Sequence, residues 1–116
     1  MNKRNFQRYD TNLQVLYEEP DKNPAPGTIL NISLGGLYMI SDSKLEKDTE
    51  LTLIFSINKE GNESTLSTSG SVLRSGKIEE DEDVMKKYNI TIPNGSYYAV
   101  LKFEAPFIEL SFMLQS

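Results

Sequence analysis

The stretch "LTLIFSINKEGNESTLSTSG", residues 51–70, decides the fold that we predict for this chain. Its first part places one set of apolar side chains on a single face, namely Leu51, Leu53, Phe55 and Ile57. Alternation with a period of two is typical of a β-strand. Gly61 then predicts a tight turn, and hydroxyl and β-branched residues follow it. We therefore expect a β-hairpin, with Gly70 at a bulge or bend of its second strand.

Short segments of the same kind flank this hairpin on both sides. We expect strands at residues 12–19, 28–33, 36–41, 51–57, 64–74 and 96–104. The proline-rich segment 20–27 and the acidic segment 75–95 are expected to be loops, the second with one helical turn. Short strands separated by turn signals predict an all-β fold, either a small antiparallel barrel or a sandwich.

The final segment, residues 106–116, fits two structures. Its apolar residues alternate from Ile108 to Leu114, as they would in a strand. Phe107, Leu110 and Leu114 also share one face of a helix, and a proline at residue 106 suits the first turn of a helix. Periodicity does not decide between the two.

The composition bounds the fold and excludes several kinds of chemistry. A chain of 116 residues with 38% hydrophobic residues suits one domain with a single core. It contains neither cysteine nor histidine, so disulfides, thiolate metal sites and Ser-His triads are excluded. We expect no enzyme, no catalytic residue and no cofactor. The basic start lacks a following apolar segment, and no apolar run approaches membrane-spanning length, so we expect a cytoplasmic protein without membrane insertion.

Charge is unevenly distributed along the chain. The net charge is −5, which argues against binding to a nucleic acid polymer. Of the three arginines, Arg4 and Arg8 lie with Lys3 in the first eight residues, so we expect a mobile cationic arm. The acidic run "EEDED", residues 79–83, alternates between faces and lacks the spacing of a calcium loop. We interpret it as a solvated loop rather than a metal site.

Two short polar motifs are candidates for ligand binding. "RNFQR", from Arg4 to Arg8, offers two planar guanidinium groups that suit phosphate and stack on flat bases. "NISLGG" places the amide of Asn31 and the hydroxyl of Ser33 two residues apart, and its glycines give a flat molecule access to the backbone. Each motif also has a simpler interpretation, a frayed terminus for the first and a tight turn for the second.

The ordered pair of motifs resembles the PilZ domain family. Its fixed positions are Arg4 and Arg8 in the first motif and Asn31, Ser33 and Gly36 in the second. Two later stretches agree, "GSVLR" at residues 70–74 and "YYAVLKFE" at residues 97–104, although alanine stands at position 99 where the family often has glycine. The resemblance extends from Arg4 to about residue 112, which is nearly the whole chain.

The resemblance implies a six-stranded antiparallel split β-barrel with an amino-terminal arm and a short carboxyl-terminal helix. We divide the chain into the arm, residues 1–12, and the barrel with its helix, residues 13–116. It also implies a ligand, the bacterial second messenger cyclic di-GMP. The predicted ligand-binding residues are Arg4, Arg8, Asn31, Ser33 and Gly36, followed by Lys3, Gly35 and Arg74. The family position of Lys3 bears on whether one or two ligand molecules bind, and Arg74 equally fits a solvated barrel surface.

Three interpretations of the function follow. In the first, cyclic di-GMP orders the arm on the barrel, and the changed surface signals to an unidentified protein. In the second, the domain is a PilZ-like interaction module that does not depend on the nucleotide. In the third, an unrelated small barrel binds single-stranded nucleic acid, which the negative charge disfavours. The intact motifs favour the first, whereas the partner and the oligomeric state are left open.

Overall fold

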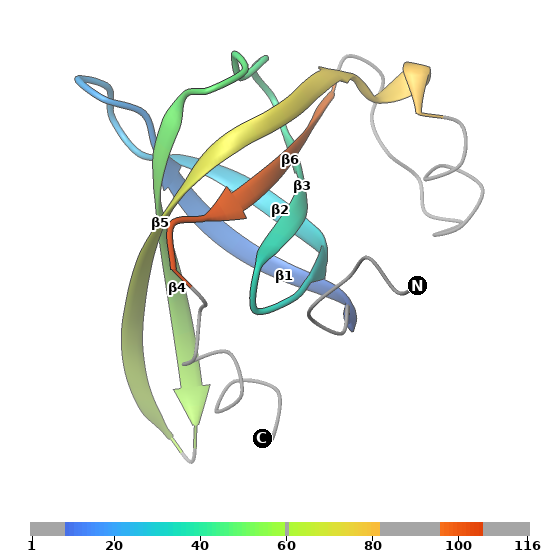
Figure 1. Cartoon of the computed structure of the whole chain (residues 1–116). Helices are drawn as coiled ribbons and strands as arrows, with labels where there is room; N and C mark the ends of the chain where they lie inside the picture. Colours follow the sequence, from blue (N-terminus) through green and yellow to red (C-terminus); the bar gives the residue numbers. More distant parts are fainter. Residues whose placement is uncertain (1–8, 60, 82–95, 106–116) are drawn as a thin grey trace.

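The chain folds into a closed antiparallel β-barrel, seen in a computed structural model that describes residues 9–59, 61–81 and 96–105 (Figure 1). The elements are β1 (Tyr9–Glu18), β2 (Ala25–Ile32), β3 (Gly36–Ser41), β4 (Glu50–Lys59), β5 (Asn62–Lys77), the 3₁₀ turn η1 (Ile78–Glu80) and β6 (Tyr97–Phe103). The six strands are ordered β1-β2-β3-β6-β5-β4 around the barrel, and the pairing of β1 with β4 closes it. The predicted six-stranded antiparallel barrel is confirmed. The predicted carboxyl-terminal helix and most of the arm lie outside the described residues.

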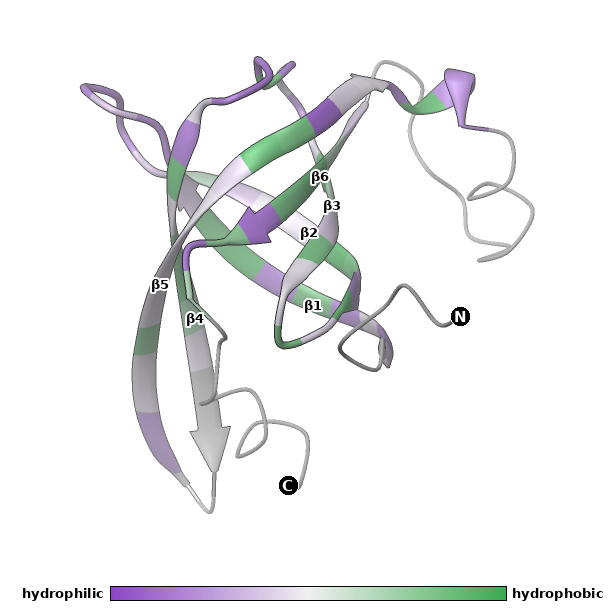
Figure 2. Cartoon of the chain, viewed as in Figure 1, coloured by the Kyte–Doolittle hydropathy of each residue, from purple (hydrophilic) through white to green (hydrophobic). Residues whose placement is uncertain are grey.

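The core of the barrel consists of inward-facing side chains from every strand and one side chain from a loop. Its members are Val15, Tyr17, Ile29, Ile32, Leu37, Met39, Leu45, Leu51, Leu53, Phe55, Val72, Ala99, Leu101 and Phe103. Figure 2 shows hydrophobic residues interspersed with hydrophilic ones along the ribbons, as the two faces of each strand require. Leu45, from the loop between β3 and β4, is fully buried and covers one end of the core. Burial of these side chains is the main favourable term in folding.

Three strand boundaries differ by three residues from those predicted, and the other differences are smaller. β2 begins at Ala25, so Pro26 lies in a strand and pairs with Leu16, because proline is tolerated near the start of a strand. β5 continues to Lys77 before η1 begins, so the predicted excursion starts later than expected. β1 begins at Tyr9, four residues before the boundary predicted between arm and barrel.

The hairpin of β4 and β5 extends beyond the rest of the barrel (Figure 1). Its strands pair from Glu50 with Ser71 to Lys59 with Asn62, whereas β1 pairs with β4 over three residues only. Gly61 has a φ of +81° in the turn, a conformation that glycine adopts without steric cost. The hairpin predicted from residues 51–70 is therefore confirmed.

The bulge predicted at Gly70 is in fact elsewhere in β5. Gly70 pairs regularly with Leu51 on one side and Phe103 on the other, and the irregularity lies between Val72 and Arg74. The glycine is required for a different reason, because a Cβ there would approach the backbone oxygen of β6 residue 102 to 2.9 Å. The bulge offered for Gly70 was wrong, because a glycine in a strand signals either a bulge or a close approach and the sequence does not say which. The bend offered as the alternative stays a prediction.

None of the helices within the described part of the chain is long and apolar enough to cross a membrane.

Gly36, the first residue of β3, lies against the backbone of β6. A Cβ on this residue would overlap the carbonyl oxygen of Leu101, which is a rigid backbone group. Gly36→Ala is therefore expected to lower the free energy of unfolding by about 2 kcal/mol or more, as overpacking in a close-packed region does. Urea unfolding of the purified protein measures the change.

The matched control is Gly61→Ala in the β4–β5 turn. A Cβ at Gly61 meets no atom within 4 Å, so only the positive φ opposes the substitution. We expect a loss of about 1 kcal/mol. Equal stability of Gly36→Ala and the unchanged protein would show that β3 and β6 are not as close as described.

Candidate functional site

The turn between β2 and β3 contains the second predicted motif. The backbone N–H of Ser33 donates to the carbonyl oxygen of Gly36 at 2.8 Å. The Ser33 hydroxyl donates to the same oxygen at 3.3 Å and accepts a hydrogen bond from the Gly35 N–H at 3.2 Å. Ser33 is buried, and its side chain holds the turn closed. The structure thus shows the turn-forming role of Ser33 that the sequence offered as its simpler interpretation.

A β-bulge places Asn31 on the outer face of the barrel. Ile29 pairs with Met39 and Ile32 pairs with Leu37, and all four side chains belong to the core. Strict alternation between Ile29 and Ile32 is impossible, because three steps separate two residues of the same face. The extra residue in β2 resolves the conflict, so that Asn31 pairs with Tyr38 between the two core pairs.

A second bulge does the same for Arg74 on β5. Val72 pairs with Leu101 inside the barrel, and Arg74 pairs with Val100 after one extra residue. That extra residue, Leu73, is 48% exposed. Without the bulge, Arg74 would share the inward face with Val72. The two bulges therefore bring Asn31 and Arg74 to the same outer surface.

The strand register arranges this surface in rows across β2, β3, β6 and β5. One row reads Asn31, Tyr38, Val100 and Arg74. The next row, toward the β2–β3 turn, reads Gly36, Lys102 and Ser71, with Ser33 beside Gly36. We call these residues, together with Tyr98, the Asn31 face. Of the predicted site residues, Asn31, Ser33, Gly36 and Arg74 lie on it and Gly35 lies in its turn.

An aromatic stack occupies the centre of the Asn31 face. The rings of Tyr38 and Tyr98 are 5.6 Å apart with an interplanar angle of 8°, and the Arg74 guanidinium lies 5.5 Å from the Tyr98 ring centroid. The Tyr38 hydroxyl donates to Asp81 Oδ2 at 3.0 Å, which ties the residue after η1 to the barrel. Sequence analysis did not predict this stack. The signal was present, since strand alternation puts Tyr38 and Tyr98 on the face opposite Leu37 and Leu101.

The environment of Tyr38 raises the pKa of its hydroxyl above the ordinary value. Burial is the largest cause, followed by the hydrogen bond and the negative charge of Asp81, and Arg74 partly offsets them. The hydroxyl therefore remains protonated and continues to donate to Asp81 throughout the physiological range. Burial also raises the pKa of Tyr17, which lies inside the barrel.

The remaining predicted residues can be placed only in part. Lys3, Arg4 and Arg8 lie outside the described residues, so their predicted contacts with a ligand stay predictions. The acidic run begins in η1, where Glu80 Oε1 accepts the Lys77 N–H at 2.9 Å. Within residues 9–59, 61–81 and 96–105, no carboxylates gather in a way that could hold a metal ion.

The described part of the chain is a small closed barrel with a polar, arginine-bearing outer face beside a glycine turn, an arrangement typical of a ligand-binding domain. The sequence model of the PilZ domain matches residues 2–96, which is most of the chain. The chain therefore belongs to the PilZ domain family, and the resemblance inferred from its motifs is confirmed. A comparison with curated proteins gives no match.

Two solved structures share the fold. The Bacillus subtilis inhibitor of motility, MotI/DgrA, superposes with a TM-score of 0.69 at 19% identity over 99% of this chain. This chain spans about half of that protein, 49% of its length. The PilZ domain of Escherichia coli YcgR, solved with c-di-GMP, superposes with a TM-score of 0.66 at 10% identity over 98% of this chain and 91% of that one. At these identities the likeness shows the fold.

Tyr38→Phe tests the link between the aromatic stack and Asp81. The substitution keeps the ring and removes the hydroxyl, so we expect a loss of about 1 kcal/mol in the free energy of unfolding near neutral pH. Above pH about 10, a tyrosine ionises in the unfolded chain while buried Tyr38 does not, so the stability that Tyr38 contributes is lost as pH rises.

The variant should consequently lose stability less steeply above that pH than the unchanged protein does. Urea unfolding at a series of alkaline pH values measures both slopes. Tyr17 is present in both proteins and cancels in the comparison. Identical slopes would contradict the raised pKa of Tyr38.

Proposed function

We propose that this domain is a receptor for cyclic di-GMP that signals to another protein. The observation that carries the proposal is the position of Asn31, the first residue of the family's second motif, on an outer face that also presents Arg74. Family membership supports the choice of ligand. The structure of the YcgR domain, which contains c-di-GMP, shows that a barrel of this fold takes the nucleotide.

The chemistry of the Asn31 face fits the parts of this ligand. Cyclic di-GMP has two phosphates and two flat guanines, whose edges carry both donors and acceptors. The Asn31 amide offers a donor and an acceptor to one guanine edge. Ser33 donates one hydrogen bond and accepts one within its turn, which leaves one lone pair on its oxygen for a guanine N–H. Gly35 and Gly36 keep that turn in place without side chains of their own.

Arginines supply the charge and the stacking surfaces in this proposal. Arg4 and Arg8 bind phosphate or the acceptor edge of guanine and cover the bases from the side of the arm. Arg74, held over Tyr98, extends the site across β5 and β6. Micromolar affinity requires a binding free energy of about −8 kcal/mol. Charge-assisted hydrogen bonds contribute about 1.5–3 kcal/mol each, and together with base stacking they exceed the entropy cost of ordering the arm and the ligand by that amount.

Ordering of the arm is the signalling event that we propose. A ligand bound to both the arm and the Asn31 face would fix residues 3–10 against the barrel. The last two of these residues, Tyr9 and Asp10, already pair with Ile32 and Asn31 at the start of β1. The bound arm and ligand then form a surface that a downstream protein recognises. We place this signalling in the bacterial cytoplasm, where the second messenger is made. The alternative, an interaction module that is independent of the nucleotide, predicts no binding at all.

Calorimetric titration with cyclic di-GMP separates these functions. We expect binding by the unchanged protein and at least about tenfold weaker binding by Arg4→Ala and by Arg8→Ala, since each loses charge-assisted hydrogen bonds. Lys47→Ala is the control, because Lys47 is exposed in the loop between β3 and β4, at the other end of β3 from the Ser33 turn. Absence of binding by the unchanged protein would support the nucleotide-independent module instead.

Hydrogen exchange tests the proposed signalling event separately. Saturating cyclic di-GMP is expected to slow amide exchange in residues 3–10, because ordered amides become protected. The protruding tip of the β4–β5 hairpin serves as an internal reference that should not change. Unaltered exchange in residues 3–10 of the bound protein would exclude the arm as the part that responds.

A further inference from the structure

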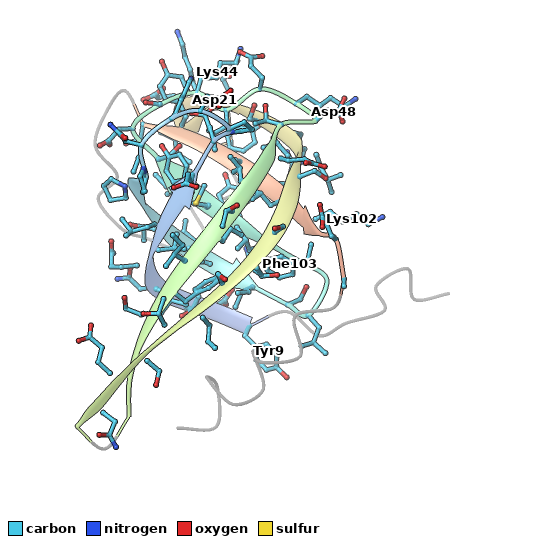
Figure 3. All side chains as sticks on the ribbon, turned by 90° about the vertical axis from the view of Figure 1, so that its left-hand side faces the viewer. Tyr9, Asp21, Lys44, Asp48, Lys102 and Phe103 are labelled. Carbon is cyan, nitrogen blue, oxygen red and sulfur yellow. The ribbon has the colours of Figure 1, made fainter. Side chains whose placement is uncertain are left out.

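Lys102 is a charged residue of the Asn31 face that lies outside both predicted ligand-binding motifs, "RNFQR" and "NISLGG". Its neighbours on β6, Leu101 and Phe103, are buried in the core, so alternation turns Lys102 outward. Lys102 is exposed, and Figure 3 shows its side chain pointing away from the barrel. The sequence predicts that "YYAVLKFE" forms the last strand. The pairing register of that strand was needed to show that Lys102 lies beside Gly36.

The register puts Lys102 directly beside the β2–β3 turn. Lys102 pairs with Gly36, and the Gly36 carbonyl oxygen accepts the two hydrogen bonds that Ser33 donates. Because Gly36 has no side chain, nothing from β3 stands between Lys102 and the turn. Two strand spacings of about 4.8 Å separate β6 from β2, so the ammonium and the Asn31 amide lie within the span of one dinucleotide.

Among the described residues, no carboxylate lies within ion-pairing distance of Lys102. The Lys22–Glu19 ion pair lies in the loop between β1 and β2, away from the Asn31 face. Asp81, which accepts a hydrogen bond from Tyr38, follows η1 at the other end of β6, where Lys77 pairs with Tyr97. On a chain with a net charge of −5, Lys102 and Arg74 form a local positive rim at the β5–β6 side of the Asn31 face.

We propose that Lys102 is a further ligand-binding residue, which contacts a phosphate of the dinucleotide from the barrel side. The inference rests on the proposed function and adds a residue to the same site. An ammonium is a compact point charge with three donors, which suits a phosphate oxygen better than the planar edge of a base. The arm would then hold the ligand from one side and Lys102 from the other.

The substitution Lys102→Gln removes the charge and keeps most of the length of the side chain. We expect about three- to tenfold weaker binding of cyclic di-GMP, the range for one exposed charge-assisted contact. The loss should be larger for Lys102→Glu, which repels the phosphate, and Lys102→Arg should restore most of the affinity. The effect should shrink as salt is raised from about 0.05 M to 0.5 M, because screening weakens an exposed charge pair.

Lys47→Gln is the matched control, since it removes the same charge from the whole chain at a site away from the Asn31 face. Thermal unfolding of all variants checks that Lys102→Gln is folded, and the recovery of binding in Lys102→Arg excludes a merely structural effect. If the unchanged protein binds and Lys102→Gln binds as tightly as Lys47→Gln, the role of Lys102 is refuted and the receptor function stands. If the unchanged protein does not bind, the receptor function fails and this inference fails with it.

Discussion

Two β-bulges determine which side chains the barrel presents to a ligand. A strand that lines a barrel alternates strictly, so an odd number of steps between two core residues forces an irregularity. β2 has such a spacing between Ile29 and Ile32, and the extra residue turns Asn31 outward. β5 uses a bulge after Val72 to turn Arg74 outward. Burial of the core thus fixes the bulge in β2, and the two bulges together place the polar side chains on one face.

The stack of Tyr38 and Tyr98 makes this face rigid and connects it to the rest of the molecule. Tyr38 lies opposite Asn31 in the strand pair, stacks on Tyr98 and donates to Asp81. Tyr98 in turn supports the guanidinium of Arg74. Side chains packed and hydrogen-bonded in this way lose little further entropy when a ligand arrives, which favours affinity. The hydrogen bond also places Asp81, one residue of the acidic run, beside the candidate site, a proximity that the solvated-loop interpretation had not foreseen.

The sequence predicted the barrel well because its strands carry clear two-residue alternation and are separated by turn residues. The hairpin of residues 51–70 and the strand of residues 36–41 were located correctly. Local departures from this regular strand pattern were not predicted correctly. A proline inside β2 and the course of β5 to Lys77 depend on pairing with neighbouring strands, and Gly70 marks a close backbone approach instead of a bulge.

By itself, the sequence determined the all-β fold and the absence of cysteine and histidine chemistry, since these follow from periodicity and composition. Its resemblance to a known family identified the motif residues of a PilZ domain. The tertiary structure alone decided which residues share a surface. Four side chains of the Asn31 face come from four different strands, β2, β3, β5 and β6, and only the register of these strands brings them together. They are Asn31, Tyr38, Arg74 and Lys102. Register depends on long-range pairing and core packing, which no local pattern encodes.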